Sequence, residues 1–320
     1  MITSRTGILA AILLLLAAVP PAAALLHEPF YLDLLRRVMI FAIAAISLNL
    51  ILGYGGMVSF GHAAYLGIGA YAVGVLAHHG IDNGWLQWAV AIGASALAAA
   101  AIGSISVRTS GIYFIMITLA FTQMLYYLGV SMEKYGGDDG MRLNVRSQFS
   151  GLIDLNDPAE FYYLVFAILV LFLYLTHRLI NSRFGLVLQA LRSNEARTRA
   201  IGYSPYPYRL AAFVISGAMC GLAGALLANQ TAFLTPEFMN WTRSGELMFM
   251  VILGGIATTA GPLLGAAALL LLEDVLQGWS VLPIWVREHW QLYLGVILVL
   301  VVLFARRGLA GLLPGKERHD

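Results

Sequence analysis

The sequence predicts an all-α, polytopic helical membrane protein with about ten membrane segments, and three observations support this fold class. Hydrophobic residues make up 60% of the 320 residues, and charged residues make up only 11%. A soluble domain carries far more charge than this. The mean hydropathy is +0.79, and uncharged stretches of about 20 residues, the length of a spanning helix, recur along the chain. We therefore treat residues 1–320 as a single transmembrane domain.

The membrane segments follow from the apolar runs, taken in order. The first run follows Arg5, and with "PPAAA" near its end it also has the pattern of a cleaved signal peptide. The eighth and ninth runs are separated by "GGIATTAGP" (254–262), so residues 244–277 could cross the membrane twice or form a re-entrant hairpin. The expected segments are 7–26, 36–53, 61–79, 85–107, 111–132, 161–180, 208–230, 244–258, 261–277 and 290–305.

Arginine and lysine orient the chain, because cytoplasmic loops carry an excess of both. The segment 181–207 and the tail after residue 305 are rich in these residues, so we place both in the cytoplasm. With ten crossings, both termini are then cytoplasmic, and the acidic segment 133–160 is external. Five basic residues fall on the outer side in this scheme and count against it: Arg36, Arg37, Lys134, Arg142 and Arg146.

Several function classes find no support in the sequence. No Walker-type phosphate loop occurs, so any ATP would have to be bound by another chain. A net charge of +2 gives no reason to expect binding to nucleic acid. We find no catalytic constellation and no cluster of metal ligands, and therefore expect no enzymatic activity, no metal and no cofactor.

Glycines interrupt the membrane stretch "LNLILGYGGMVSFGHAAYLGIGAYAVGVL" (48–76). Unwound backbone at membrane depth needs protein or a water cavity around it, and transporters often place their substrate sites at such breaks. A second glycine-interrupted stretch, 253–272, follows in the other half of the chain. After the first break, four small residues share one helix face, which we expect to admit a neighbouring helix closely: Ala63, Gly67, Ala70 and Gly74.

Six polar residues in or beside the membrane segments are candidates for the transport pathway. For each of them the alternative is a hydrogen bond between helices, and for the histidine it is a neutral imidazole within the core. The candidates are Asn49, Ser59, His62, Thr118, Thr122 and Gln123.

The basic stretch 181–207 is the most specific part of the sequence. Phe184–Ile201 has the composition of a helix but is too polar to span a membrane, and Gly202 with Pro205 beyond it fits a helix end. A short cytoplasmic helix of this kind has the form of a docking element. The alternative is a solvated basic loop.

Five stretches resemble, in the same order, the permeases of ABC importers for branched-chain amino acids. The external "GGDDG" (136–140) is similar to the M-type permease rather than to its H-type companion. The resemblance covers most of residues 45–277. The five stretches are "LNLILGYGGMVSFGHAAYLGIGAYAVGVL", "GIYFIMITLAFTQMLYYL", "GGDDGM", "ALRSNEARTRAIGYSPYPYRLAAFVISGAMCGLAGALLA" and "MVILGGIATTAGPLLGAAALLLLEDVL".

The resemblance implies a permease of the type II ABC importer kind in a bacterial inner membrane, surrounded by lipid. Such a chain would pair with an H-type permease above two cytoplasmic ATPase subunits, and a periplasmic binding protein would deliver the substrate for alternating access. Asp138 and Asp139 would receive the binding protein, or would only support a turn. The residues that would meet an ATPase are Arg192, Ser193, Asn194, Glu195, Ala196 and Gly202.

Two alternatives to this function stay open. Importers of urea, amides or aromatic acids use closely similar permeases. An ion-coupled secondary transporter would normally keep a carboxylate inside the membrane, and no acid lies centrally in an expected segment.

Overall fold

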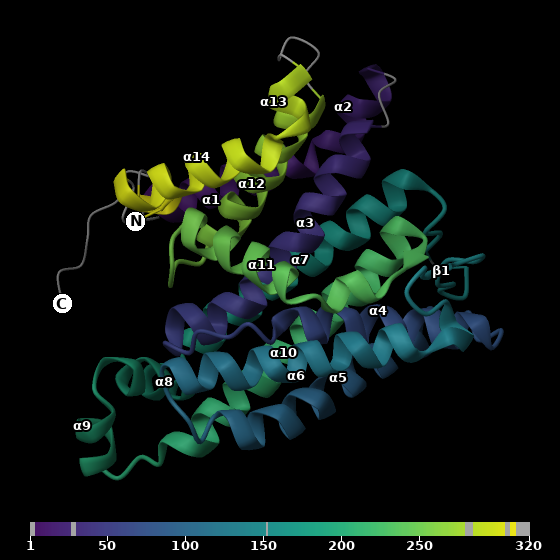
Figure 1. The fold of residues 1–320 in the computed structure, drawn as a ribbon. Helices are drawn as coiled ribbons and strands as arrows, with labels where there is room; N and C mark the ends of the chain where they lie inside the picture. The colour runs from purple at the N-terminus through teal and green to yellow at the C-terminus, as the bar shows by residue number, and fades with distance from the viewer. Residues whose placement is uncertain (1–3, 27–29, 152, 279–283, 305–307, 312–320) are drawn as a thin grey trace.

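The computed structural model describes residues 4–26, 30–151, 153–278, 284–304 and 308–311. Helices dominate this part of the chain, and each expected membrane segment coincides with a helix or with two consecutive helices (Figure 1). The helices are α1 (Ser4–Ala17), α2 (Val19–Leu26), α3 (Phe30–Asn49), α4 (His62–His78), α5 (Gly84–Ser106), α6 (Ile112–Ser131), α7 (Pro158–Ile180), α8 (Arg183–Ser193), α9 (Glu195–Ala200), α10 (Pro205–Thr231), α11 (Trp241–Gly254), α12 (Gly261–Gly278), α13 (Ile284–Glu288) and α14 (Trp290–Phe304).

Shorter elements interrupt this helical chain. A π-helical turn, η1, continues α3, and two strands form a small antiparallel sheet that the all-α prediction did not contain. The short elements are η1 (Leu50–Tyr54), η2 (Glu133–Tyr135), β1 (Met141–Arg142), β2 (Phe233–Leu234), η3 (Pro236–Met239) and η4 (Leu309–Gly311).

Six helices in the described part of the chain are long and apolar enough to cross a membrane: α3 with η1, α5, α6, α7, α10 and α12. The other expected segments fall on shorter helices. For example, α11 has 14 residues, or roughly 21 Å at 1.5 Å per residue, which is less than the ~30 Å hydrocarbon core of a bilayer. The polytopic helical class is therefore confirmed, while the number of ten crossings stays a prediction.

The centre of the molecule is formed by α3, α4 and α10. Most of these helices is buried, whereas α5 and α6 leave most of their surface uncovered. Large apolar side chains point outward from the peripheral helices; Leu97 on α5 and Tyr113 on α6 are 73% and 74% exposed. Apolar surface of this extent suits contact with lipid.

Glycines allow α10 to pack closely against α4 and α5. A Cβ built on Gly224 of α10 would lie 1.8 Å from the carbonyl oxygen of Leu66, and one on Gly69 of α4 would lie 1.9 Å from that of Gly221. On the side facing α5, a Cβ on Gly217 would lie 2.5 Å from the Cβ of Ala99. No side chain fits in such spaces, so these positions need glycine.

The face of α4 predicted to admit a helix has a different neighbour. The chain after α10 runs along this face of α4. Leu234 lies beside Gly74, and Met239 lies beside Gly67. The chain then reaches Ala63, whose amide N–H donates to the Ser244 hydroxyl at 2.9 Å. The small residues of this face thus make room for side chains of β2 and η3 and for the start of the helix α11. The prediction of a close helix contact is confirmed only in part, since Ala70 also lies beside Gly224 of α10.

The two ends of the molecule differ in structure (Figure 1). At the β1 end, the strand pairs with β2, and the amide of Ser147 donates to Asn229 on α10 at 2.9 Å. Arg36 is buried there, ion-paired with Asp33 and lying 4.4 Å from the ring centre of Phe161. A basic residue that counted against the orientation is thus neutralised within the protein.

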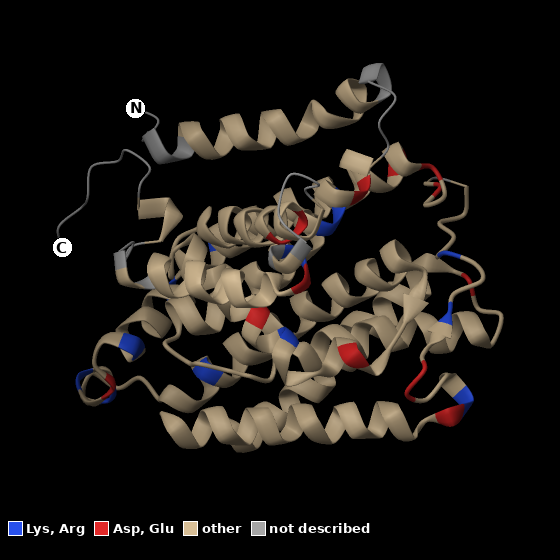
Figure 2. Cartoon of the chain, turned by 45° about the horizontal axis from the view of Figure 1, so that its top comes forward, with Lys and Arg blue, Asp and Glu red and all other residues tan. Residues whose placement is uncertain are grey.

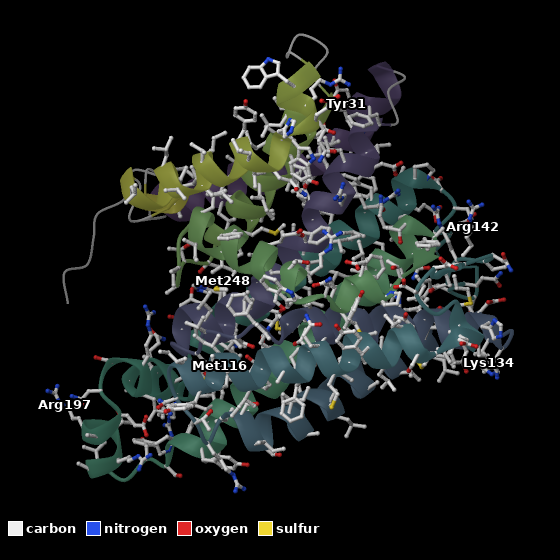
Figure 3. The ribbon with its side chains drawn as sticks, viewed as in Figure 1. Tyr31, Met116, Lys134, Arg142, Arg197 and Met248 are labelled. Carbon is white, nitrogen blue, oxygen red and sulfur yellow. The ribbon has the colours of Figure 1, made fainter. Side chains whose placement is uncertain are left out.

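The α8–α9 end lies opposite the β1 end. Figure 3 places Arg197 at this end and Lys134 and Arg142 at the other, with Met116 and Met248 between them. In Figure 2, charged residues lie in the loops at both ends of the molecule and also at several places between them, while most of the helical ribbon carries none. Long helices with so little charge are typical of a protein that crosses a membrane.

Candidate functional site

The break after α3 begins as a widened turn. The amide of Gly55 donates to Leu50 at 3.2 Å, and that of Met57 donates to Ile51 at 2.9 Å. Gly56 has φ +67°, a conformation that favours glycine. The helix therefore ends here, and residues 55–61 run without regular structure to α4. Turns of the π type inside helices are frequent at functional sites.

Asn49 joins this break to the second one. Its side-chain Nδ2 donates to the carbonyl of Thr258 at 2.9 Å, and its Oδ1 accepts from the amide of Ala257 at 3.0 Å. Asn49 is fully buried. Gly53 completes the contact, because a Cβ there would lie 2.1 Å from Asn49 Oδ1 and 2.7 Å from the Ala257 nitrogen.

The second break separates α11 from α12 as the sequence predicted, but it begins earlier than expected. The helix ends at Gly254 rather than at residue 258, because Gly255 and Ala257 have φ of +117° and +60°. A Cβ on Gly265 would lie 1.7 Å from the carbonyl oxygen of Met250, so the two helices pack backbone to backbone. The break also borders a cavity of about 600 Å³ between α1 and α7.

Two threonines of α6 hold the first break from another side. Thr118 accepts from the amide of Phe60 at 3.3 Å, and Thr122 donates to the carbonyl of Phe60 at 3.1 Å. The Ser59 hydroxyl accepts from the amide of Gly61 at 3.0 Å. All three hydroxyl residues are buried, so they satisfy backbone groups that the missing helix leaves without partners.

His62 takes part in a buried chain of hydrogen bonds. Its Nε2 lies 2.7 Å from the hydroxyl of Ser216 on α10, and that hydroxyl donates to the carbonyl of Ser47 on α3. Nε2 therefore carries the proton and donates, and Nδ1 is left unprotonated, with no partner among the described residues. His62 is thus held in the core by a hydrogen bond between helices, and its role in the transport pathway stays a prediction.

The structure thus gathers five of the six pathway candidates around residues 49–62. Each of the five is buried and hydrogen-bonded within the protein. Gln123 is half-buried on α6 and is not part of this group. Three serines that were not among the candidates also bind at these contacts: Ser47, Ser216 and Ser244. Ser47 and Ser216 lie among small residues of membrane helices, which is a recognisable signal for helix contacts.

The predicted helix Phe184–Ile201 is two helices, because Asn194 breaks it. Asn194 has an extended backbone (φ −157°, ψ 100°), and its side chain caps α9 by accepting from the amide of Arg197 at 2.9 Å. Asparagine is among the best residues for this position. The helix end at Gly202 is confirmed by its φ of +97°, whereas Pro205 begins α10 instead of lying in a loop.

Glu195 ties α9 to α10. One carboxylate oxygen lies 2.5 Å from Arg199 and the other 2.8 Å from Arg209. Partial burial is the largest single influence and raises the pKa of Glu195, but the two arginines together outweigh it and hold the pKa below its usual range. The carboxylate is therefore charged near neutral pH.

Arg192 connects α8 to the first break. Its guanidinium donates to the carbonyl oxygen of Gly53. Its side-chain stem covers Gly56, where a Cβ would lie 2.8 Å from Arg192 Cγ. The sequence singled out Arg192 for an ATPase contact and gave no sign of this one.

The remaining surface of α8 and α9 is open. Ser193 and Ala196 are exposed. Two large apolar residues are exposed as well, Leu186 by 61% and Ile201 by 67%. This part of α8 and α9 is therefore accessible from outside the chain.

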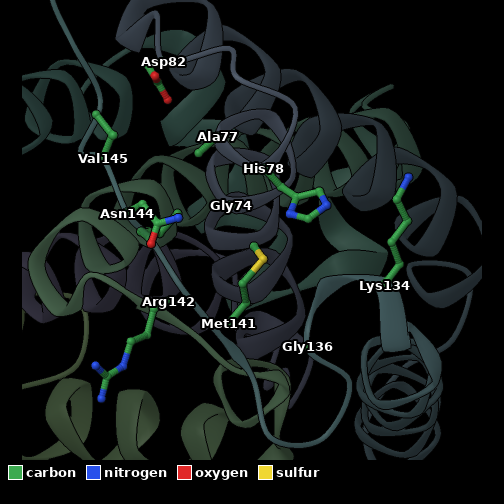
Figure 4. A pocket seen from close by; sticks show the side chains of 11 residues that line it. Gly74, Ala77, His78, Asp82, Lys134, Gly136, Met141, Arg142, Asn144 and Val145 are labelled. Carbon is green, nitrogen blue, oxygen red and sulfur yellow. The ribbon is translucent and has the colours of Figure 1, made fainter.

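The "GGDDG" stretch forms a tight turn at the β1 end. Gly136, Gly137 and Gly140 have φ of 95°, 53° and 78°, and Asp138 and Asp139 are exposed at its tip. A cavity of about 460 Å³ opens nearby between α4 and β1, and Figure 4 shows Lys134 and Arg142 on opposite sides of it. Among the residues described, no group of three or more His, Cys, Asp or Glu side chains could hold a metal ion.

Fold and site together define a polytopic helical membrane protein of the permease class, with two broken helices that contact each other and a polar segment at one end. The family model described as "Branched-chain amino acid transport system / permease component" matches residues 30–303, and the chain belongs to this family.

Three relatives illustrate the range of similarity. The chain is 29% identical to LivM, a high-affinity branched-chain amino acid transport system permease protein of Escherichia coli, over 87% of this chain and 69% of LivM. It is 24% identical to LivH of the same system, over 85% and 91%. It is 29% identical to LsrC, an autoinducer 2 import system permease protein of Enterobacter, over 86% and 80%. No solved structure matches the chain.

Proposed function

We propose that this chain is the M-type permease subunit of an ATP-driven importer for branched-chain, hydrophobic amino acids. The observation that carries the proposal is the α8–α9 segment, which presents an open surface at one end of the molecule and contacts the broken helices through Arg192. Membership of the permease family and similarity to LivM support the substrate class. Its partners are an H-type permease, two ATPase subunits and a periplasmic binding protein.

The proposed orientation puts the α8–α9 end in the cytoplasm and the β1 end outside, in a bacterial inner membrane. In Figures 1 and 2, the start of α1 and the end of α14 lie toward the α8–α9 side, which supports cytoplasmic termini. The basic tail after residue 305 lies outside the described residues. Asp138 and Asp139 at the β1 end are then placed to meet the binding protein.

The proposed mechanism is alternating access powered by the partner ATPases, and the chain itself performs no chemistry. Arg192, Ser193, Asn194, Glu195, Ala196 and Gly202 form the segment that contacts an ATPase. The pathway passes beside the first break. Because Ser59, His62, Thr118 and Thr122 are hydrogen-bonded inside the protein here, the pathway opens only when these contacts rearrange.

The proposal is tested by reconstituting the chain with and without its partners in proteoliposomes. The chain alone should show neither ATPase activity nor uptake. The complete assembly should hydrolyse ATP faster when the binding protein carries leucine, and should accumulate leucine. Uptake by the chain alone, driven by a proton or sodium gradient, would refute the proposal and establish the ion-coupled alternative.

The substrate has a second candidate class. LsrC belongs to an import system for autoinducer 2, so similarity to this family is compatible with other small solutes, including urea, amides and aromatic acids. Calorimetric titration of the partner binding protein with leucine, urea and phenylacetate separates these classes, because that protein selects the substrate.

A further inference from the structure

We propose that Arg192 is a positioning residue that couples α8 to both broken helices, with Asn49 as the second link. The inference deepens the proposed function, on which its transport test rests. It concerns a route through the chain, from the α8–α9 segment to residues 49–56 and on to residues 255–260. Each step of the route is a contact between side chain and backbone.

The first link is Arg192 with the end of η1. The last carbonyl groups of a helix lack partners within it, and a positive charge is favoured at that end. Arg192 supplies both a donor and a charge by binding the carbonyl oxygen of Gly53. Because the side-chain stem also packs over Gly56, Arg192 holds the turn at two positions, and a shift of α8 displaces residues 53–56.

The second link is Asn49 with the break after α11. Both polar groups of its amide are used, on Thr258 and Ala257, and the Asn49 side chain is itself buried. Separating the two breaks would leave this buried amide without its partners, which is unfavourable. The two breaks are therefore expected to move together.

The position of Gly53 joins the two links. It lies between Arg192, which binds its carbonyl, and Asn49 with the Ala257 amide, which leave no room for a Cβ. A residue in contact with both partners transmits displacement between them, because packed interiors shift between discrete arrangements and do not deform smoothly. Glu195 and Arg209 connect α9 to α10 by a separate route.

The direct test is amide hydrogen exchange on the purified full-length chain. Arg192→Ala should raise exchange at the Ala257 amide by roughly fivefold, the low end of typical coupling between sites. Arg192→Lys keeps the charge and should restore part of the protection. Arg197→Ala, at an exposed arginine on α9, is the matched control and should change nothing there. Equal exchange in Arg192→Ala and Arg197→Ala would overturn the proposal.

The transport test uses the complete assembly in proteoliposomes. Arg192→Ala should hydrolyse ATP but import fewer leucine molecules per ATP, and Arg178→Ala, at an exposed arginine on α7 outside the α8–α9 segment, should match the native chain. Asn49→Ala should show the same defect. If that buried variant fails to fold, the result for Arg192→Ala alone tests the proposal. Native uptake per ATP in Arg192→Ala would refute the relay and leave the importer function standing. The hydrogen-exchange measurement at Ala257 uses the chain without any partner. Its outcome therefore does not depend on the importer function.

Discussion

At the scale of the residue, the glycines fall into two groups with different roles. Gly56, Gly202 and Gly255 have positive φ and end or turn helices. Gly69 and Gly224 lie within regular helices and allow two backbones to approach. The first group serves conformation and the second serves packing, so the same substitution has different consequences in each.

Gly224→Ala should destabilise the protein strongly, because the added Cβ would lie 1.8 Å from the Leu66 carbonyl oxygen. Overpacking of this kind typically costs about 1–3 kcal/mol. The matched control is Gly93→Ala on α5, where nothing lies within 4 Å of the new Cβ. That control should be neutral or stabilising by up to ~1 kcal/mol. The measurement is the thermal unfolding midpoint in detergent, and equal midpoints for the two variants would contradict this account of the α4–α10 contact.

Glu195→Lys should uncouple ATP hydrolysis from uptake while leaving the membrane helices folded. The change removes the ion pairs with Arg199 and Arg209 and adds repulsion from both. Exposed pairs contribute only about 0–1 kcal/mol to stability, so the effect appears in the placement of α9. Co-purification of the ATPases and uptake in proteoliposomes measure it. Glu133→Lys, at an exposed acid near the other end, is the control and should behave as the native chain.

The titration of Glu195 predicts the pH range over which its ion pairs hold α9 in place. Its pKa is lowered in the folded chain by the two arginines, so the ion pairs are fully present above the ordinary glutamate pKa of about 4.3. They are lost only as the pH falls through the lowered value. Between about pH 5.5 and 8, Glu195 stays ionised. Its ionisation should therefore not change the coupling of ATP hydrolysis to uptake in the native chain over this range. Glu195→Gln should lower coupling by the same factor throughout this range, whereas a defect that appears only at one end of it would contradict this assignment.

At the scale of the element, the two ends of the helices define two sides of the molecule. The second strand, β2, the start of α5 and the start of α7 lie near β1, and the ends of α5 and α7 lie toward α8. The chain therefore passes repeatedly between the ends. This alternation places residues 133–160 and 181–207 at opposite ends of the molecule, as the proposed orientation requires.

Single cysteines at Asn144 and Ser193 should react with an impermeant thiol reagent from opposite sides of the membrane. Both positions are exposed, whereas Ser147 is only 3% exposed and would be a poor label site. Cys220 is fully buried and should stay silent in the parent chain. The measurement is labelling of intact spheroplasts and of inverted vesicles, and reaction of both cysteines in the same preparation alone would refute the orientation.

At the scale of the whole molecule, α3, α4 and α10 form a buried centre whose polar residues bind each other or the backbone. Helices α5 and α6 expose large apolar side chains around this centre, a surface that suits contact with lipid.

Local sequence was enough to predict the membrane class, most of the helices and the approximate positions of the two breaks. These properties depend on local composition: about 20 apolar residues make a spanning segment, and glycines interrupt a helix wherever they occur together. The resemblance to the permease family also rested on local motifs, and the family match confirmed it.

Which residues contact each other across the fold could not be predicted from local sequence. Asn49 binds a carbonyl 209 positions away, and Arg192 binds one 139 positions away. Neither pairing has a local signature, because a buried amide can bind any free backbone group that folding brings near it. The small face of α4 shows the same limit: its spacing correctly predicted close neighbours, but which elements these are, namely β2, η3 and the start of α11, depends on how the rest of the chain packs.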